Sequence, residues 1–126
     1  MSYERLALGV GATLAGLNVV KPAVIRGESG VEHKFTFVAA SGSQVYAFDI
    51  YAEVGEVEVI RTYIKKLDTG ATTSVVCLSG KAKPEAQDLS ASYGIDILGP
   101  KEVEDFFSKR VSQMANPPRG SAEQKS

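Results

Sequence analysis

Residues 35–51, FTFVAASGSQVYAFDIY, constrain the fold of this chain more than any other stretch, because they hold two β-rich runs joined by a tight loop. The runs are FTFVAA and QVYAFDIY, and the SGS between them is a short Gly-containing loop of the kind that closes β-hairpins. The first strand extends back through VEHK to residue 31. The pattern predicts an antiparallel pair in the middle of a sheet, with one acidic residue, Asp49, near the end of the second strand.

Two further elements precede this hairpin. Residues 19–27, VVKPAVIRG, are rich in β-branched side chains, and Pro22 favours an edge strand or the start of a strand. Before them, large apolar residues recur at helical spacing and predict a first helix that Ser2 could cap. The apolar face that we expect on this helix consists of Leu6, Val10, Leu14 and Leu17.

The second half of the chain alternates helix and strand signals. Residues 54–67 have the periodicity of an amphipathic helix, and Gly70 lies just beyond its end. The residues expected to form its apolar face are Val57, Ile60, Ile64 and Leu67. TTSVVCLSG, residues 72–80, is a short continuous apolar run, which is typical of a central strand covered on both faces.

Three more elements complete the order. PEAQDLSASYG, residues 84–94, predicts a helix with Pro84 in its first turn and Gly94 as its C-terminal stop. IDILG, residues 95–99, is a short strand. A last helix spans residues 101–114 and carries the apolar side chains Val103, Phe106, Phe107, Val111 and Met114.

The predicted order is therefore αβββαβαβα, an α/β fold with a mixed central sheet flanked by helices. The length of 126 residues suits one domain, which we place at residues 1–115. Residues 116–126, NPPRGSAEQKS, contain no large apolar side chain, and we expect a disordered C-terminal tail there.

Composition excludes several classes of protein. The net charge of −1 provides no global positive field for nucleic acid or an anionic membrane, so nucleic-acid binding would need a local patch. LALGVGATLAGLNVV is shorter than the roughly 20 apolar residues that span a bilayer, and Glu4 and Arg5 before it cancel, so we expect neither a membrane segment nor a signal peptide. The one cysteine, Cys77, cannot form an internal disulfide, and we expect a buried thiol in a cytoplasmic protein.

This order of elements resembles the core of the restriction-endonuclease-like superfamily, the PD-(D/E)XK nucleases, and especially its archaeal Holliday junction resolvase and Mrr-like branches. The resemblance covers most of residues 3–110. FTFVAA is similar to the family's PDIVA segment, and AFDIY is similar to its IEVK segment. It implies that the family's strand Asp falls on Thr36, its second acidic residue on Asp49, its Lys on Tyr51 and its helical Glu on Glu4.

Two of the three strand positions therefore differ from the family's pattern. Two carboxylates on neighbouring strands hold Mg²⁺, and the metal with a Lys activates water, so Thr36 and Tyr51 predict a degenerate nuclease site without a cofactor. The alternative is a Mg²⁺-dependent nuclease with Asp49 as metal ligand, rebuilt from Asp49, Glu53 and Glu4. Asp49 also suits a structural role, as a carboxylate hydrogen-bonded near the end of its strand.

Other chemically capable residues have simpler interpretations. His33, the one histidine, alternates with apolar residues, which favours a structural imidazole on the apolar side over a catalytic base. GESG, residues 27–30, is interpreted as a turn. Cations late in the helices, namely Lys65, Lys66, Lys109 and Arg110, complement the helix dipoles. The candidate nucleic-acid-binding residues are Lys34, Lys65, Lys66, Lys81 and Lys83.

Three functions remain open from the sequence. The leading hypothesis is a noncatalytic module that binds nucleic acid, with DNA the expected partner, in DNA processing or defence. The second is the metal-dependent nuclease, and the third is a protein-interaction scaffold that uses a sheet edge or the last helix. The resemblance also implies a homodimer.

Overall fold

The computed structural model describes residues 3–115, and side chains through residue 108. The expected tail at residues 116–126 and the expected cap at Ser2 lie outside the described residues. The side chains of Lys109 and Arg110 also lie outside them.

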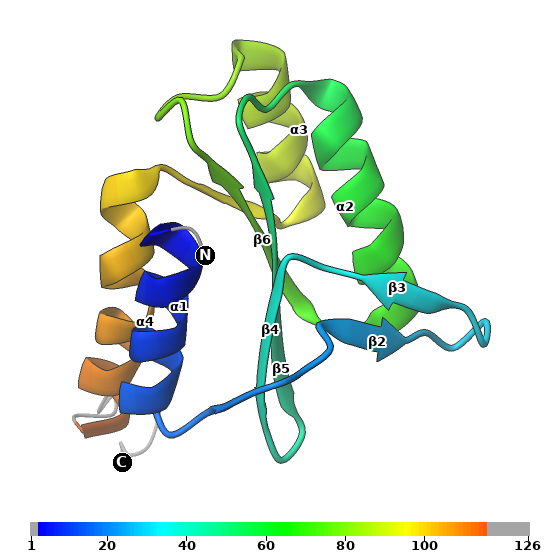
Figure 1. Ribbon diagram of the computed structural model, residues 1–126. Coiled ribbons are helices and arrows are strands. Elements are labelled where there is room, and N and C mark those ends of the chain that lie inside the picture. The colour runs from blue at the N-terminus through cyan, green and yellow to red at the C-terminus, as the bar shows by residue number, and fades with distance from the viewer. Residues whose placement is uncertain (1–2, 116–126) are drawn as a thin grey trace, which may run out of the picture.

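A five-stranded mixed sheet forms the centre of the molecule (Figure 1). Its strands run in the order β1 (Asn18–Val19), β4 (Phe37–Ser41), β5 (Gln44–Tyr51), β6 (Thr72–Cys77) and β7 (Asp96–Leu98). β1, β4 and β5 are antiparallel neighbours, whereas β5, β6 and β7 are parallel. The predicted hairpin is the β4–β5 pair, in which Ser41 faces Gln44 across a turn with Gly42 at φ 58°.

Helices cover both faces of this sheet (Figure 1). α1 (Tyr3–Leu14) and α4 (Pro100–Ala115) pack on one face, and α2 (Glu56–Thr69) and α3 (Pro84–Tyr93) on the other. α3 begins with Pro84, and Gly94 terminates it, as predicted; Gly94 adopts the left-handed conformation. The predicted α/β class is therefore confirmed. None of the helices within residues 3–115 has the length and apolar character needed to span a membrane.

A two-stranded arm is the main departure from the predicted order. It pairs β2 (Val24–Arg26) with β3 (Glu32–Lys34) in an antiparallel hairpin outside the central sheet. The predicted strand at 19–27 is broken at Pro22, which has no N–H for a ladder. The predicted strand at 31–40 is broken at a bend at Thr36, whose Oγ1 accepts the Ile50 N–H at 3.1 Å. Five strands thus replace the predicted three.

The apolar face of α1 is not the one that was predicted. Leu6, Val10 and Leu14 are 55%, 54% and 73% exposed, while the buried side chains of α1 are Leu8 and Ala12. The fourth predicted member, Leu17, is buried, but it lies beyond the end of the helix. The side of α1 that approaches α4 is the side with small residues. A Cβ on Gly11 would lie 2.9 Å from Phe107 Cδ2, so only glycine allows the two helices to come this close.

The predicted apolar face of α2 also points to solvent. Its members are between 41% and 64% exposed: Val57, Ile60, Ile64 and Leu67. The side chains of α2 that are fully buried are Val59 and Thr62. The prediction was wrong because it assumed that the most apolar side of the helix is the buried one. In the structure, α2 packs a more polar side against the sheet.

The core on the α1–α4 face is aromatic. Phe48 of β5 contacts Phe37, Phe106 and Phe107 with ring centroids 5.2–5.8 Å apart, in edge-on geometry. On the opposite face, Val75 and Cys77 of β6 pack under α2 and α3, and Cys77 is buried as expected. β6 is an interior strand, between β5 and β7, while β5 is the middle strand of the sheet.

Candidate functional site

Asp49, the acidic residue near the end of the hairpin's second strand, is buried between β5 and α2. It is 4% exposed. Thr62 Oγ1 donates a hydrogen bond to Asp49 Oδ2 at 2.9 Å, and Lys65 Nζ forms an ion pair with the same oxygen at 2.7 Å. A buried carboxylate needs such partners, because uncompensated burial of its charge would be costly. These contacts are those of a structural carboxylate.

The Lys65 ammonium makes three contacts inside the protein. Besides Asp49, its Nζ donates to the Lys34 carbonyl at 2.8 Å and lies 4.5 Å from the centroid of the Phe35 ring. The ammonium therefore joins α2, β5 and the end of β3. A cation engaged in this way is not well placed to bind phosphate, although the sequence favoured it.

Tyr51 shares a face of β5 with Asp49. Burial raises the pKa of the Tyr51 phenol, and the Asp49 carboxylate raises it further, against an opposing hydrogen bond with Thr62. The phenol is therefore neutral at physiological pH. It cannot supply the positive charge that a Lys would bring to this position.

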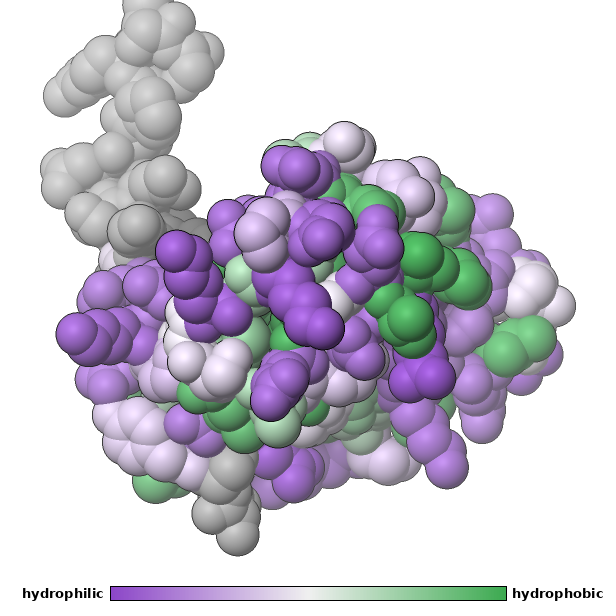
Figure 2. Space-filling view, turned by 90° about the horizontal axis from the view of Figure 1, so that it is seen from above, coloured by the Kyte–Doolittle hydropathy of each residue, from purple (hydrophilic) through white to green (hydrophobic). Residues whose placement is uncertain are grey.

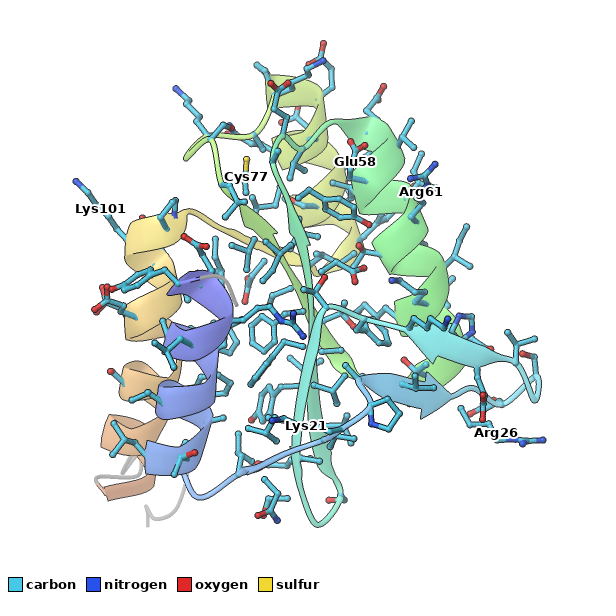
Figure 3. The ribbon with its side chains drawn as sticks, viewed as in Figure 1. Lys21, Arg26, Glu58, Arg61, Cys77 and Lys101 are labelled. Carbon is cyan, nitrogen blue, oxygen red and sulfur yellow. The ribbon has the colours of Figure 1, made fainter. Side chains whose placement is uncertain are left out.

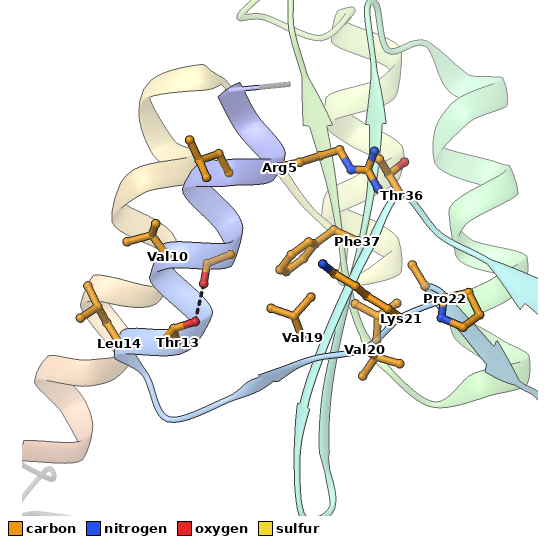
Figure 4. A pocket seen from close by; sticks show the side chains of 14 residues that line it. Arg5, Val10, Thr13, Leu14, Val19, Val20, Lys21, Pro22, Thr36 and Phe37 are labelled. Atoms are coloured by element: carbon orange, nitrogen blue, oxygen red, sulfur yellow. Dashed lines mark hydrogen bonds between the residues drawn. The ribbon is translucent and has the colours of Figure 1, made fainter. Parts of the chain in front are cut away.

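Thr36 does not converge on Asp49 and Tyr51. Its hydroxyl oxygen accepts the Ile50 N–H, and it lies beside Arg5 at one end of a groove on the α1 side (Figure 4). Glu4 belongs to α1, which packs on the Phe48 face of the sheet, whereas Asp49 points to α2 on the other face. Glu53 is exposed just after β5.

The three carboxylates expected for the nuclease alternative are therefore not brought together. Among the residues the structure describes, no three His, Cys, Asp or Glu side chains are arranged so that they could hold a metal ion.

The candidate basic residues divide between two ends of α2. Lys81 and Lys83 are exposed in the loop between β6 and α3, next to the start of α2, since the Lys83 N–H donates to the Val54 carbonyl at 3.1 Å. Lys34 is exposed in β3, near the other end of α2. Lys66 turns inward and donates to the Tyr93 carbonyl at 3.3 Å.

The loop that carries Lys81 and Lys83 lies at the carboxyl ends of the parallel strands β5, β6 and β7. Crevices at this edge of open α/β sheets commonly bind ligands. Figure 2, which views this edge, shows many hydrophilic side chains over it. Lys101 projects from the first turn of α4 beside the same edge (Figure 3). Lys101 was not among the predicted binding residues, although its position two residues after the predicted strand at 95–99 was a signal for it.

Asp68, at the end of α2, holds the β2–β3 arm. Its carboxylate accepts the Ser29 hydroxyl at 2.6 Å and the Ser29 N–H at 2.9 Å, and its Oδ2 lies 2.7 Å from His33 Nε2. These Ser29 hydrogen bonds and the His33 contact lower the pKa of Asp68 to about 2. His33 is therefore a structural imidazole, but its partner is a carboxylate and not the expected apolar layer.

The GESG segment is a turn, as expected, with Gly30 at φ 91°. It lies close against α2, because a Cβ on Gly27 would clash with the Asp68 carboxylate. A phosphate group would have to compete with the Asp68 carboxylate at this turn, so the segment has no character of a phosphate-binding loop.

A groove of about 710 Å³ lies between α1 and the segment that joins β1 to β2 (Figure 4). Its lining is mostly apolar and includes the exposed side of α1, with Arg5 and Lys21 as the cations (Figure 4). The volume is within the range of sites for small molecules. No sequence pattern predicted this groove, because the groove forms only if Leu6 and Val10 face outward from α1.

The fold and the site together define a mixed α/β protein with a five-stranded sheet between two pairs of helices. A solved structure of a protein of unknown function, AF1548, has a similar fold: the TM-score is 0.59 at 16% sequence identity, over 96% of this chain and 71% of that one. No protein-family model matches the sequence, and no curated protein does either. At this identity the likeness shows the fold alone.

Proposed function

We propose that this chain is a noncatalytic module with a restriction-endonuclease-like core that binds nucleic acid, in DNA processing or defence. The Asp49–Lys65 ion pair is the observation that supports the absence of catalysis in this proposal. The one acidic residue that aligns with the family's strand positions is neutralised by Lys65, hydrogen-bonded by Thr62 and 4% exposed. A hard cation would have to displace both partners to reach it.

Binding is assigned to the edge that carries Lys81, Lys83 and Lys101. Their ammonium groups extend from loops and a helix start at the carboxyl ends of parallel strands, where a phosphate backbone could approach without crossing a helix. With so few cations, the affinity is expected to be weak and to fall steeply with salt.

The binding part is tested by fluorescence anisotropy with labelled duplex, single-stranded and four-way-junction DNA at low ionic strength. Lys81→Glu with Lys83→Glu is expected to weaken binding at least about tenfold and to reduce the salt dependence. Lys21→Glu with Arg26→Glu reverses the same number of charges elsewhere and serves as the control. Equal affinity for the wild type and the Lys81, Lys83 variant would refute this binding surface.

The noncatalytic part is tested by incubating the same DNA substrates with Mg²⁺ or Mn²⁺. No cleavage is expected. Metal-dependent cleavage that disappears in Asp49→Ala would contradict the proposal and favour the nuclease alternative.

A protein-interaction scaffold is a second candidate function. The observation that favours it is the row of exposed apolar side chains on α2, since monomeric proteins rarely expose such a patch without a partner. No DNA binding by the wild type at low salt would favour this candidate.

A further inference from the structure

One side of α2 carries an apolar row that no described part of the chain covers. We call this row the α2 stripe; its members are Val57, Ile60, Ile64 and Leu67. The opposite side of the same helix is buried at Val59 and Thr62, so the stripe faces directly away from the sheet. Figure 2 shows a hydrophobic patch on the side of the molecule where α2 lies.

The spacing of the stripe is that of a helix-pairing seam. Three, four and three residues separate its members, which is the a, d, a, d pattern of two consecutive heptads. β-branched residues occupy the first three positions and Leu the last. Such a seam buries its side chains when a second helix with the same repeat packs against it at a shallow angle.

The charges beside the stripe favour a second copy of this helix in parallel orientation. Glu56 precedes the first seam residue and Arg61 follows the second, which are the g and e positions of the heptad. In a parallel pair, a g residue faces the e residue five positions further along the partner, so Glu56 of each copy faces Arg61 of the other. An antiparallel pair would instead bring the two Arg61 side chains together at the two-fold axis.

Both charged side chains lie at the surface, where a partner can reach them, and Arg61 also lies near the Glu58 carboxylate of its own helix. Glu56 and Arg61 are exposed, and Arg61 points outward from α2, away from the sheet (Figure 3). The pairing is isologous, so two copies close into a dimer with no further growth.

We propose that two copies of this chain associate through parallel packing of their α2 stripes, with reciprocal Glu56–Arg61 pairs at the flanks. The seam is short, because α2 has 14 residues and is therefore roughly 21 Å long. It buries less than the roughly 800 Å² per partner of a standard interface, so the dissociation constant is expected to be in the micromolar range. This inference goes beyond the proposed function and does not depend on it.

Sedimentation velocity without nucleic acid, from about 1 to 500 μM protein, tests the association. The wild type is expected to shift from monomer to dimer. Ile60→Glu is expected to remain monomeric, and Leu6→Glu, which changes an exposed apolar position on α1, is expected to dimerise normally. A wild type that stays monomeric over the whole range would overturn the proposal and leave a different protein as the partner of the stripe.

The charge pairs and the orientation are tested separately. Glu56→Arg is expected to weaken dimerisation, and adding Arg61→Glu is expected to restore it. Under mild oxidation, Leu67→Cys alone is expected to form a disulfide-linked dimer, because a parallel pair places the two copies of this position side by side. Crosslinking only in a mixture of Val57→Cys and Leu67→Cys would show antiparallel packing and refute the assigned orientation.

Discussion

The two faces of β5 are buried by different kinds of contact, apolar packing on one face and polar pairing on the other. On one face, Phe48 is fully buried among the aromatic rings of β4 and α4. On the other face, the next residue, Asp49, is also buried, but its contacts are an ammonium and a hydroxyl from α2. The first face needs only apolar side chains of suitable size, whereas the second needs a helix that brings polar partners to a defined atom.

This difference explains the orientation of α2. The side of the helix that carries Thr62 and Lys65 must face the sheet, because Asp49 would otherwise hold an uncompensated buried charge. Asp68, at the end of the helix, fixes the arm in the same way. With its polar partners turned inward, α2 presents its stripe to solvent.

The largest effect is expected on the aromatic face. Phe48→Ala removes a fully buried ring and leaves a cavity, which should lower the free energy of unfolding by about 3–5 kcal/mol. Urea denaturation followed by circular dichroism measures the change. A loss below about 1 kcal/mol would show that this face is loosely packed.

A somewhat smaller loss is expected on the polar face, and it should be asymmetric. Lys65→Met leaves the Asp49 carboxylate buried without its cation and should cost about 3 kcal/mol. Asp49→Asn should cost less, because the Lys65 side chain is 19% exposed and can turn to water. The double variant should lose less stability than the sum of the two single losses. Strictly additive losses would contradict the Asp49–Lys65 ion pair.

Acid should weaken the attachment of the arm. The folded-state pKa of Asp68 is about 2, below the ordinary value of 3.8, so its contribution is present above about pH 4 and is lost as the pH falls toward 2. The partners that face its carboxylate are Ser29 and His33. Urea midpoints of the wild type and Asp68→Asn should therefore differ at pH 5 and converge near pH 2, whereas a constant difference would refute this assignment.

The smallest effect is expected on the α2 stripe. Ile64→Gln changes a side chain that is 55% exposed, so at a concentration that keeps the protein monomeric the free energy of unfolding should change by less than about 0.5 kcal/mol. Val59→Ala, on the buried side of the same helix, is the matched control and should cost more. Equal losses would contradict the assigned orientation of α2.

Local sequence signals predicted the elements of this fold well. The β4–β5 hairpin, the Pro84 start and Gly94 end of α3, and the buried Cys77 of β6 each follow from turn chemistry or short apolar runs. The α/β class follows from their order. The break at Pro22 has a local cause, because proline has no N–H for a ladder. The break at Thr36 could not be read from the sequence, because it depends on the hydrogen bond that the Thr36 side chain makes to β5.

The orientation of the helices was not predictable from periodicity alone. On α1, the close approach of Gly11 to Phe107 outweighs the larger apolar area of Leu6 and Val10. On α2, contacts with Asp49 outweigh the apolar content of the opposite side. Of the candidate site residues, the position of Asp49 near the end of its strand was apparent, but its pairing with Lys65 depends on tertiary structure.

The central claim is that α2 turns its polar side to Asp49 and its apolar stripe outward. Thiol labelling of Ile64→Cys tests it most directly: the rate of reaction with a thiol-specific reagent is measured at a concentration that keeps the protein monomeric. Val59→Cys, on the buried side of the helix, is the matched comparison, and Cys77 is buried in both variants. The thiol at position 64 should react within about tenfold of a free thiol, and the thiol at position 59 should be strongly protected in the native protein. Strong protection at position 64 with rapid labelling at position 59 would contradict the account.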